Sequence, residues 1–202
     1  MMEKRKTAVD ALRKEMRDAR LPLKSSAAQL VFGEGPRHPA VMFIGEAPGR
    51  KEDESGRPFV GAAGCELDTL LRSISLQRKD VYITSVLKYR PPKNRDPRAS
   101  EVSAHVPFLI RQIELLRPRV LATLGNWATR LILAGGDPCV MGAMPPIGKV
   151  HGTERNIRIG KRQYTVLPLY HPAAILYNRS LEDVARKDIQ YLKKVISNGS
   201  TR

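Results

Sequence analysis

Four short apolar runs of strand length recur along the chain, with helical patterns between them. The runs begin at residues 40, 80, 119 and 164 and read AVMFIG, DVYITSVL, RVLATL and YTVLPL. Apolar residues at helical spacing cover residues 65–75, 100–116, 126–134 and 181–196. Strands that alternate with helices build a mostly parallel sheet, because parallel neighbours need a crossover connection. We therefore expect an α/β fold, with any ligand bound beyond the carboxyl ends of the strands.

A further helical pattern covers residues 2–20, where Val9, Leu12, Met16 and Ala19 share one face and Pro22 follows. The opposite face is strongly basic, and we expect it to be solvated rather than bound to a partner. With 202 residues, the chain has the size of one ordinary domain. We expect a single domain over residues 1–202, with residues 1–22 as an N-terminal amphipathic basic helix.

The charge is strongly positive, with 35 Lys and Arg against 20 Asp and Glu, a net charge of +15. The basic residues are spread along the chain, which favours a folded surface that binds a polyanion such as DNA. No apolar run reaches the roughly 20 residues needed to span a bilayer, and no lipidation motif is present. We expect no membrane partner and, because the basic N-terminus lacks an apolar segment, a cytoplasmic location.

The two cysteines, Cys65 and Cys139, lie in unrelated contexts without a C-x-x-C motif. We expect two reduced, buried thiols, although the sequence alone leaves a disulfide open.

The first apolar run leads into a glycine-rich loop, GEAPG at residues 45–49, which continues to Gly64. Glycines allow the backbone to approach a ligand closely, and Glu46 stands where the strand ends. The loop contains neither G-x-x-x-x-G-K-[ST] nor the spacing of G-x-G-x-x-G, which argues against a nucleotide hydrolase.

Four motifs in order resemble the thermophile-type, family 4 uracil-DNA glycosylases. They are GEAPG, E-D-x-x-G-R-P-F-V-G-x-A-G, VYIT followed by K-x-R-P-P-x-N-R, and Y-H-P-A-A, and the resemblance runs from about residue 31 to the end. It implies a three-layer α/β/α sandwich around a four-stranded, mainly parallel sheet. It also implies a monofunctional enzyme that flips a deaminated base out of DNA and hydrolyses its N-glycosidic bond.

The resemblance assigns roles to individual residues. Glu46 matches the acidic residue that positions the attacking water, and His171 matches the histidine that donates a hydrogen bond to the departing base. Phe59 matches the aromatic residue on which the base stacks. The expected base-binding residues are Gly45, Ala47, Phe59 and Ser85. Cleavage leaves an oxocarbenium-like sugar and an anionic base, so a carboxylate and a donor suffice, and we expect no metal or other cofactor.

The expected DNA contacts follow the same motifs. Residues 173–178 match the loop that wedges into a duplex, with Leu176 as the inserted side chain. The expected DNA-binding residues are Arg57, Lys88, Arg90, Lys93, Arg95, Leu176 and Arg179. A second basic patch is possible at Arg155, Arg158, Lys161 and Arg162, and solvation is as good an explanation for any one of these charges.

Two positions depart from the family pattern. Ser85 stands where family members carry an Asn that reads uracil, and a hydroxyl cannot present both amide groups in fixed geometry. We therefore expect weaker uracil discrimination or a preference for hypoxanthine or xanthine, unless Ser85 reaches the base through water. The family also holds a four-iron cluster, but Tyr89 and His105 occupy two of its cysteine positions and residues 17–26 contain no Cys. A four-thiolate cluster cannot be built from this sequence.

The sequence also allows other functions. A damage-binding module would keep the base pocket without turnover, and a DNA-coating protein would explain the charge but not the loop motifs. Glu46, Phe59 and His171 each have a structural explanation when taken singly. We treat His151, in GKVHG, as an ordinary histidine. We expect a monomer that acts on single- or double-stranded DNA and associates with the nucleoid.

Overall fold

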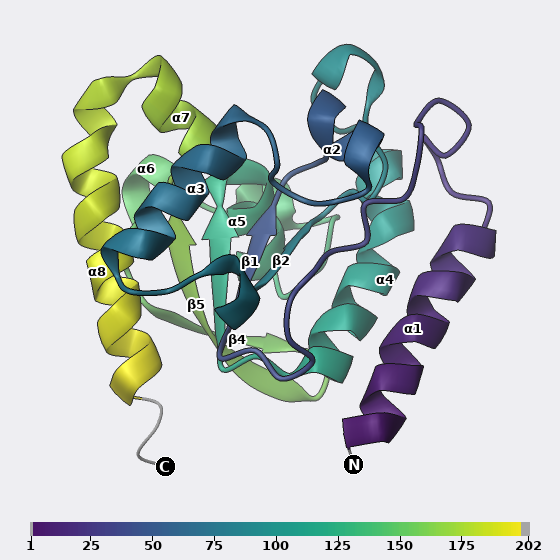
Figure 1. Cartoon of the computed structure of the whole chain (residues 1–202), viewed down its shortest axis with the longest axis horizontal. Helices are drawn as coiled ribbons and strands as arrows, with labels where there is room; N and C mark the ends of the chain where they lie inside the picture. The colour runs from purple at the N-terminus through teal and green to yellow at the C-terminus, as the bar shows by residue number, and fades with distance from the viewer. Residues whose placement is uncertain (1, 199–202) are drawn as a thin grey trace.

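The computed structural model describes the backbone of residues 2–198 and the side chains of residues 7–197. Within this part of the chain, a five-stranded sheet has the order β2-β1-β3-β5-β4, with helices on both of its faces (Figure 1). The strands are β1 (Val41–Gly45), β2 (Tyr82–Ser85), β3 (Val120–Leu124), β4 (Arg155–Ile159) and β5 (Arg162–Leu169). All neighbours are parallel except β4, which runs antiparallel to β5. The predicted α/β fold and its four parallel strands are confirmed.

The prediction of a four-stranded sheet is wrong in the number of strands, because it did not include the edge strand β4. Its sequence is RNIRI, and only Ile159 is buried. Charged side chains are usual on an edge strand because they discourage pairing with other chains, and they hide the strand from a search for apolar runs. The hairpin to β5 turns at Gly160, whose φ of +57° favours glycine.

Helices cover the two faces of the sheet in separate layers. They are α1 (Met2–Asp18), α2 (Arg50–Ser55), α3 (Ala62–Ser73), α4 (Ala99–Leu116), α5 (Gly125–Leu133), α6 (Ile147–Val150), α7 (Pro172–Tyr177) and α8 (Glu182–Asn198). Short 3-10 helices are η1 (Arg78–Asp80), η2 (Pro92–Asn94), η3 (Met141–Ala143) and η4 (Arg179–Leu181). One buried cluster joins α1, α4 and α5 to the sheet, and the other joins α3, α7 and α8 to its opposite face. The three-layer α/β/α arrangement is visible in Figure 1, with α1 and α4 on one side and α3 and α8 on the other.

The N-terminal helix α1 buries the predicted apolar stripe. Val9, Leu12 and Met16 are at most 1% exposed and join the cluster that also contains α4 residues. An ion pair between Glu15 and Arg111 links the two helices with N–O distances of 2.5 and 2.7 Å. Because both side chains are about half exposed, burial of the apolar stripe contributes more to this contact than the ion pair does.

The prediction of two buried thiols is wrong, because Cys65 and Cys139 are both exposed, and both are free within the described chain. Cys65 lies on the outer face of α3. Cys139 lies in the connection after α5, where its backbone N–H donates to the side chain of Asp137 at 2.8 Å. Among the described residues, no helix is both long and apolar enough to cross a membrane.

Apolar and aromatic side chains fill the region where family 4 relatives would hold an iron–sulfur cluster. Tyr89 and His105 are 3% and 0% exposed, and their rings meet edge to face with centroids 6.1 Å apart. Leu21 and Leu23 pack against the hydrophobic core cluster that contains Tyr89. His105 Nδ1 already pairs with the carbonyl oxygen of Glu101 at 2.8 Å. The side chains present here supply no thiolate and do not fit a four-thiolate cluster.

Candidate active site

The loops after β1, β2 and β5 surround a cavity of about 490 Å³ at the carboxyl edge of the sheet. Its lining brings together the two predicted catalytic residues and three of the predicted base-binding residues from separate segments of the chain, namely Glu46, Ala47, Phe59, Ser85 and His171. They meet because the carboxyl ends of neighbouring parallel strands lie at the same edge, and each segment follows or ends one of these strands. The volume lies within the usual range for a pocket that takes a small planar molecule.

Glu46 is the first residue after β1, and its backbone is fixed because its carbonyl accepts from Leu87 N at 3.0 Å. Burial, and then the negative charge of Asp96, raise the pKa of its carboxyl from 4.5 to about 7. A carboxylate with a pKa near neutrality suits a group that orients water or accepts a proton.

His171 caps the N-terminus of α7 and is held in one tautomer. Its Nδ1 accepts a hydrogen bond from Ala173 N at 3.1 Å, so Nδ1 carries no proton. Burial lowers the pKa of the imidazole to about 4, although the charge of Glu52 acts to raise it. At neutral pH the ring is therefore uncharged, and its proton lies on Nε2 as a hydrogen-bond donor.

Phe59 lies beside His171, with ring centroids 5.6 Å apart and an interplanar angle of 32°. Its backbone has a φ of +52°, which is uncommon for a bulky residue. Gly45 makes room for the ring, since a Cβ atom at this position would lie 2.6 Å from Phe59 Cζ. Gly45 itself is not among the residues that line the cavity, and its contact with a base stays a prediction. Ser85 ends β2, is 3% exposed, and lines the cavity.

The prediction that Lys88 contacts DNA is wrong, because Lys88 is fully buried. Its Nζ donates to Gln112 Oε1 at 2.8 Å and to Thr84 Oγ1, and burial lowers its pKa well below the usual value. A lysine among arginines and prolines resembles an exposed loop residue. The partner amide comes from α4, and no local pattern indicates it.

Four of the other predicted DNA-binding residues are arginines or lysines near the cavity. Arg95 lines the cavity but is paired with Glu101 at 2.5 and 2.9 Å. Lys93 is exposed, and Arg90 donates to Asn94 Oδ1 at 2.7 Å. Arg179 is 67% exposed, and its Nη1 lies 3.9 Å from a carboxylate oxygen of Glu66 and 3.7 Å from one of Glu182. We call these four residues, Arg90, Lys93, Arg95 and Arg179, the basic rim of the cavity.

Arg57 is the remaining predicted arginine, and its guanidinium is engaged. Its Nε donates to Glu34 Oε2 at 2.8 Å, and its Nη2 donates to Glu34 Oε1 at 3.2 Å. The side chain is still 61% exposed.

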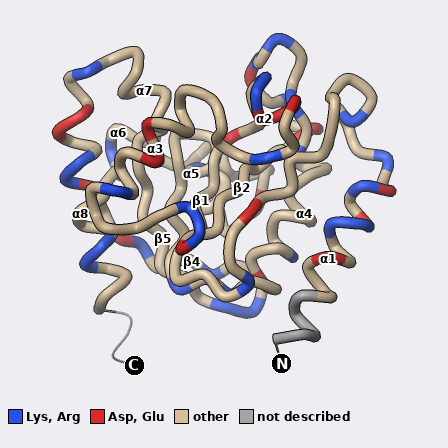
Figure 2. Tube along the Cα trace, viewed as in Figure 1, with Lys and Arg blue, Asp and Glu red and all other residues tan. Residues whose placement is uncertain are grey.

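The possible second basic patch lies away from the cavity. This holds for three of its residues, Arg158, Lys161 and Arg162, which surround the β4–β5 turn at the amino end of β5. Arg155, at the start of the antiparallel strand β4, pairs instead with Val166, nearer the carboxyl end of β5. The cavity lies beyond the carboxyl end of the eight-residue strand β5, about 26 Å from the turn at 3.3 Å per residue. Figure 2 shows that Lys and Arg are spread over many elements of the fold, so a basic segment alone does not locate a site.

Tyr177, an aromatic residue at the cavity opening, lies in the predicted wedge segment 173–178 but was not singled out there. Tyr177 is 92% exposed and lines the cavity, whereas the neighbouring Leu176, predicted to be the wedge, is 36% exposed. Ile175 is fully buried under the same short helix. An exposed aromatic side chain at a pocket mouth is a surface on which a nucleobase can stack.

A cavity at the sheet edge of an α/β sandwich that combines a buried carboxyl, a neutral histidine and the aromatic rings of Phe59 and Tyr177 is typical of base-flipping enzymes that act on nucleic acid. The sequence profile of the uracil DNA glycosylase superfamily matches residues 32–196, and the chain belongs to this superfamily.

Individual relatives within the superfamily are named Type-4 and Type-5 uracil-DNA glycosylases, and the Type-4 proteins share the higher identity. The Type-4 uracil-DNA glycosylase of Saccharolobus solfataricus is 43% identical over 169 residues, which cover 83% of this chain and 76% of the relative. The Type-4 uracil-DNA glycosylase of Archaeoglobus fulgidus is 42% identical over 181 residues, covering 90% and 89%. A Type-5 uracil-DNA glycosylase of Pyrobaculum aerophilum is 34% identical over 153 residues, covering 68% and 63%. The resemblance stated from the motifs is confirmed.

Proposed function

We propose that this protein is a monofunctional DNA glycosylase that removes uracil from DNA in base excision repair. The observation that carries the proposal is the pair Glu46 and His171, which face one cavity with pKa values moved in opposite directions, to about 7 and about 4. Environments that separate two titrating groups in this way are typical of active sites. The names of the relatives, Type-4 uracil-DNA glycosylase, support the same activity.

The chemistry follows from the placement of three side chains. The flipped base stacks on Phe59, and the Nε2–H of His171 donates to a base carbonyl. As the C1′–N bond breaks, its electron pair moves onto the base, and this hydrogen bond strengthens as negative charge grows. Water held by the Glu46 carboxylate adds to C1′, and its proton passes to the carboxylate.

A lyase step through an amine is not expected. The cavity lining within the described chain includes no lysine. Lys88, the closest in sequence to Ser85, directs its Nζ to Gln112 and Thr84. Without an amine to form a Schiff base, the product is an abasic site in an intact strand.

A cleavage panel tests the proposal. Labelled single- and double-stranded oligonucleotides that carry uracil, hypoxanthine or xanthine are incubated with the wild type or with Glu46→Ala and are then heated in alkali. Strand breaks at uracil that depend on both protein and alkali, and that are lost in Glu46→Ala, are the expected result. Binding to damaged DNA without breaks would favour the alternative, a damage-binding module. The carboxylate of raised pKa favours the enzyme, since a binder needs the stacking surface but not a water-positioning group.

The base preference is the finer part of the proposal and depends on Ser85. Because its hydroxyl cannot read both the N3 hydrogen and the O4 acceptor of uracil, we expect activity on hypoxanthine or xanthine beside uracil. Ser85→Asn is expected to improve uracil excision and to reduce excision of the other bases. The same panel measures this ratio, and an unchanged ratio would refute the role of Ser85.

We further propose that the protein is a monomer that acts on DNA in the nucleoid. We also propose that the exposed residues of the basic rim, including Lys93 and Arg179, bind the phosphate backbone. Phosphate contacts of this kind make affinity fall steeply with salt. Measuring DNA affinity against salt for Lys93→Ala and Arg179→Ala tests these contacts, with a shallower salt dependence expected for each variant. Sedimentation of the free protein and of its DNA complex tests the monomer.

A further inference from the structure

The stacking residue Phe59 has a backbone conformation that its own chain does not favour. Its φ of +52° lies in the left-handed region, where a bulky side chain is rarely found. Such a conformation persists only when surrounding contacts hold it, and it is common at functional sites. The contacts that hold Phe59 therefore also fix the surface offered to the base.

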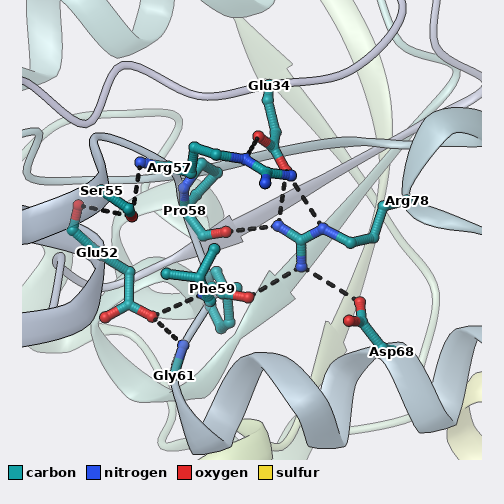
Figure 3. Close-up of polar contacts among 10 residues, drawn as sticks. Glu34, Glu52, Ser55, Arg57, Pro58, Phe59, Gly61, Asp68 and Arg78 are labelled. Carbon is teal, nitrogen blue, oxygen red and sulfur yellow. Dashed lines mark hydrogen bonds and ion pairs between the residues drawn. The ribbon is translucent and has the colours of Figure 1, made fainter.

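Arg78, from η1, binds the backbone of this segment directly (Figure 3). Its Nη1 donates to the carbonyl oxygen of Phe59 at 2.9 Å, and its Nη2 donates to that of Pro58 at 2.6 Å. The planar guanidinium spans two successive carbonyls, which a single ammonium group cannot do with the same geometry. These contacts tie the Phe59 backbone to the start of β2.

Two carboxylates hold the guanidinium itself in place. Glu34 Oε1 accepts from Arg78 Nη2 at 2.7 Å and from Nε at 3.2 Å, and Asp68 Oδ1 accepts from Nη1 at 3.2 Å. Glu34 is fixed in turn by backbone hydrogen bonds with Ile83 at 3.0 and 2.8 Å. Asp68 belongs to α3. Arg78 is only 21% exposed, so it joins the segment before β1, η1 and α3 around the Phe59 backbone.

Glu52 holds the other side of Phe59. Its Oε1 accepts from the backbone N–H groups of Val60 at 2.8 Å and Gly61 at 2.7 Å. Gly64 leaves space below, since a Cβ atom there would lie 1.8 Å from the carbonyl oxygen of Phe59. The segment is therefore held through its carbonyls by Arg78 and through its following amides by Glu52 (Figure 3).

We propose that Arg78 is a positioning residue that holds Phe59 where it stacks on the flipped base. The inference rests on the proposed function, because it assigns Arg78 to the excision of a stacked base. Arg78 acts through Phe59 and does not line the cavity within the described chain. Its loss is therefore expected to slow excision while leaving affinity for undamaged DNA unchanged.

The primary experiment compares Arg78→Ala with Lys79→Ala. Lys79 is an exposed residue of the same short helix and provides the same loss of charge. Single-turnover excision of uracil is expected to fall on the order of 10- to 100-fold in Arg78→Ala, as for other displacements of a substrate-positioning group. Affinity for undamaged duplex should stay within about twofold. Lys79→Ala should excise like the wild type. Equal rates for the two variants would overturn the inference.

A double-mutant cycle separates positioning from general stabilisation. If Arg78 acts through Phe59, Arg78→Ala should cause little further loss of rate in a Phe59→Ala background. The same loss in both backgrounds would refute the proposal. Arg78→Lys keeps the charge and one contact, and it is expected to excise at an intermediate rate. If Arg78→Ala does not fold, Arg78→Lys replaces it in every comparison. Excision by Arg78→Lys at the wild-type rate would then overturn the inference.

Hydrogen exchange provides a measurement that does not depend on activity. The amides of Val60 and Gly61 should exchange faster in the Arg78 variant than in Lys79→Ala, because release of the Phe59 backbone loosens their bonds to Glu52. Unchanged exchange there contradicts the inference. A wild-type protein that removes no uracil would refute the proposed function alone, and exchange would still test the role of Arg78.

Discussion

Excision of uracil by this enzyme is expected to rise about tenfold between pH 6 and pH 8. In the proposed mechanism Glu46 is ionised when it holds the attacking water, and its pKa is raised to about 7 by burial and by Asp96. With this pKa, about one tenth of the carboxyl groups are ionised at pH 6 and about nine tenths at pH 8. His171, with a pKa lowered to about 4, stays neutral over the whole range and adds no slope. Asp96→Asn removes the second cause of the shift and should move the rise to lower pH.

The assay is single-turnover excision from a single-stranded uracil oligonucleotide between pH 5.5 and 9. Constant ionic strength is essential, because DNA affinity depends on salt. A single strand avoids changes in duplex stability with pH. The matched control is Glu46→Gln, whose small residual rate should not vary over this range. A wild-type profile without the rise, or a rise that survives in Glu46→Gln, would refute the role assigned to Glu46.

Three further predictions concern stability and duplex opening. Because the pKa of Glu46 is raised in the folded protein, its carboxyl lowers stability progressively as the pH rises from 4.5 to about 7, and Glu46→Gln should raise the melting temperature more at pH 8 than at pH 5. Lys88→Ala should lower the free energy of unfolding by about 2–5 kcal/mol in urea titrations, since it leaves a buried cavity and removes the hydrogen bonds from Nζ to Gln112 and Thr84. The salt dependence of its DNA binding should be unchanged, and a shallower slope would mean that Lys88 meets phosphate after all. Tyr177→Ala should reduce excision from duplex DNA more than from single strands, because a stacking side chain at the cavity mouth matters most when a base must leave a helix; equal losses would argue against that role.

Much of the fold was predictable because burial on both faces leaves a clear signal. The residues of β1, β2 and β3 are all buried, and these strands read as continuous apolar runs. The edge strand β4 has exposed arginines and carries no such signal. The short helices α2, α6 and α7 contain four to six residues, which is too short for periodicity to reveal them.

The candidate site was predictable as far as it follows strand ends. Glu46, Ser85 and His171 each lie at or just beyond the carboxyl end of a strand, so sheet topology alone brings them together. A prediction fails where a side chain's environment comes from a distant segment. Lys88 is buried against Gln112, which lies 24 positions away. The space that Gly45 leaves for the ring of Phe59 likewise has no local sequence pattern.

The hydrogen bond from Ala173 N to His171 Nδ1 determines how the enzyme responds to acid. A main-chain amide does not titrate in the physiological range, so the tautomer of the imidazole is set by the backbone and stays the same when the surroundings change. Of the two groups in the proposed mechanism, mild acidification then titrates the carboxyl of Glu46 and leaves the imidazole donor of His171 unchanged. On the proposed mechanism, one proton thereby lowers the rate reversibly while the hydrogen-bond donor in the pocket keeps its orientation.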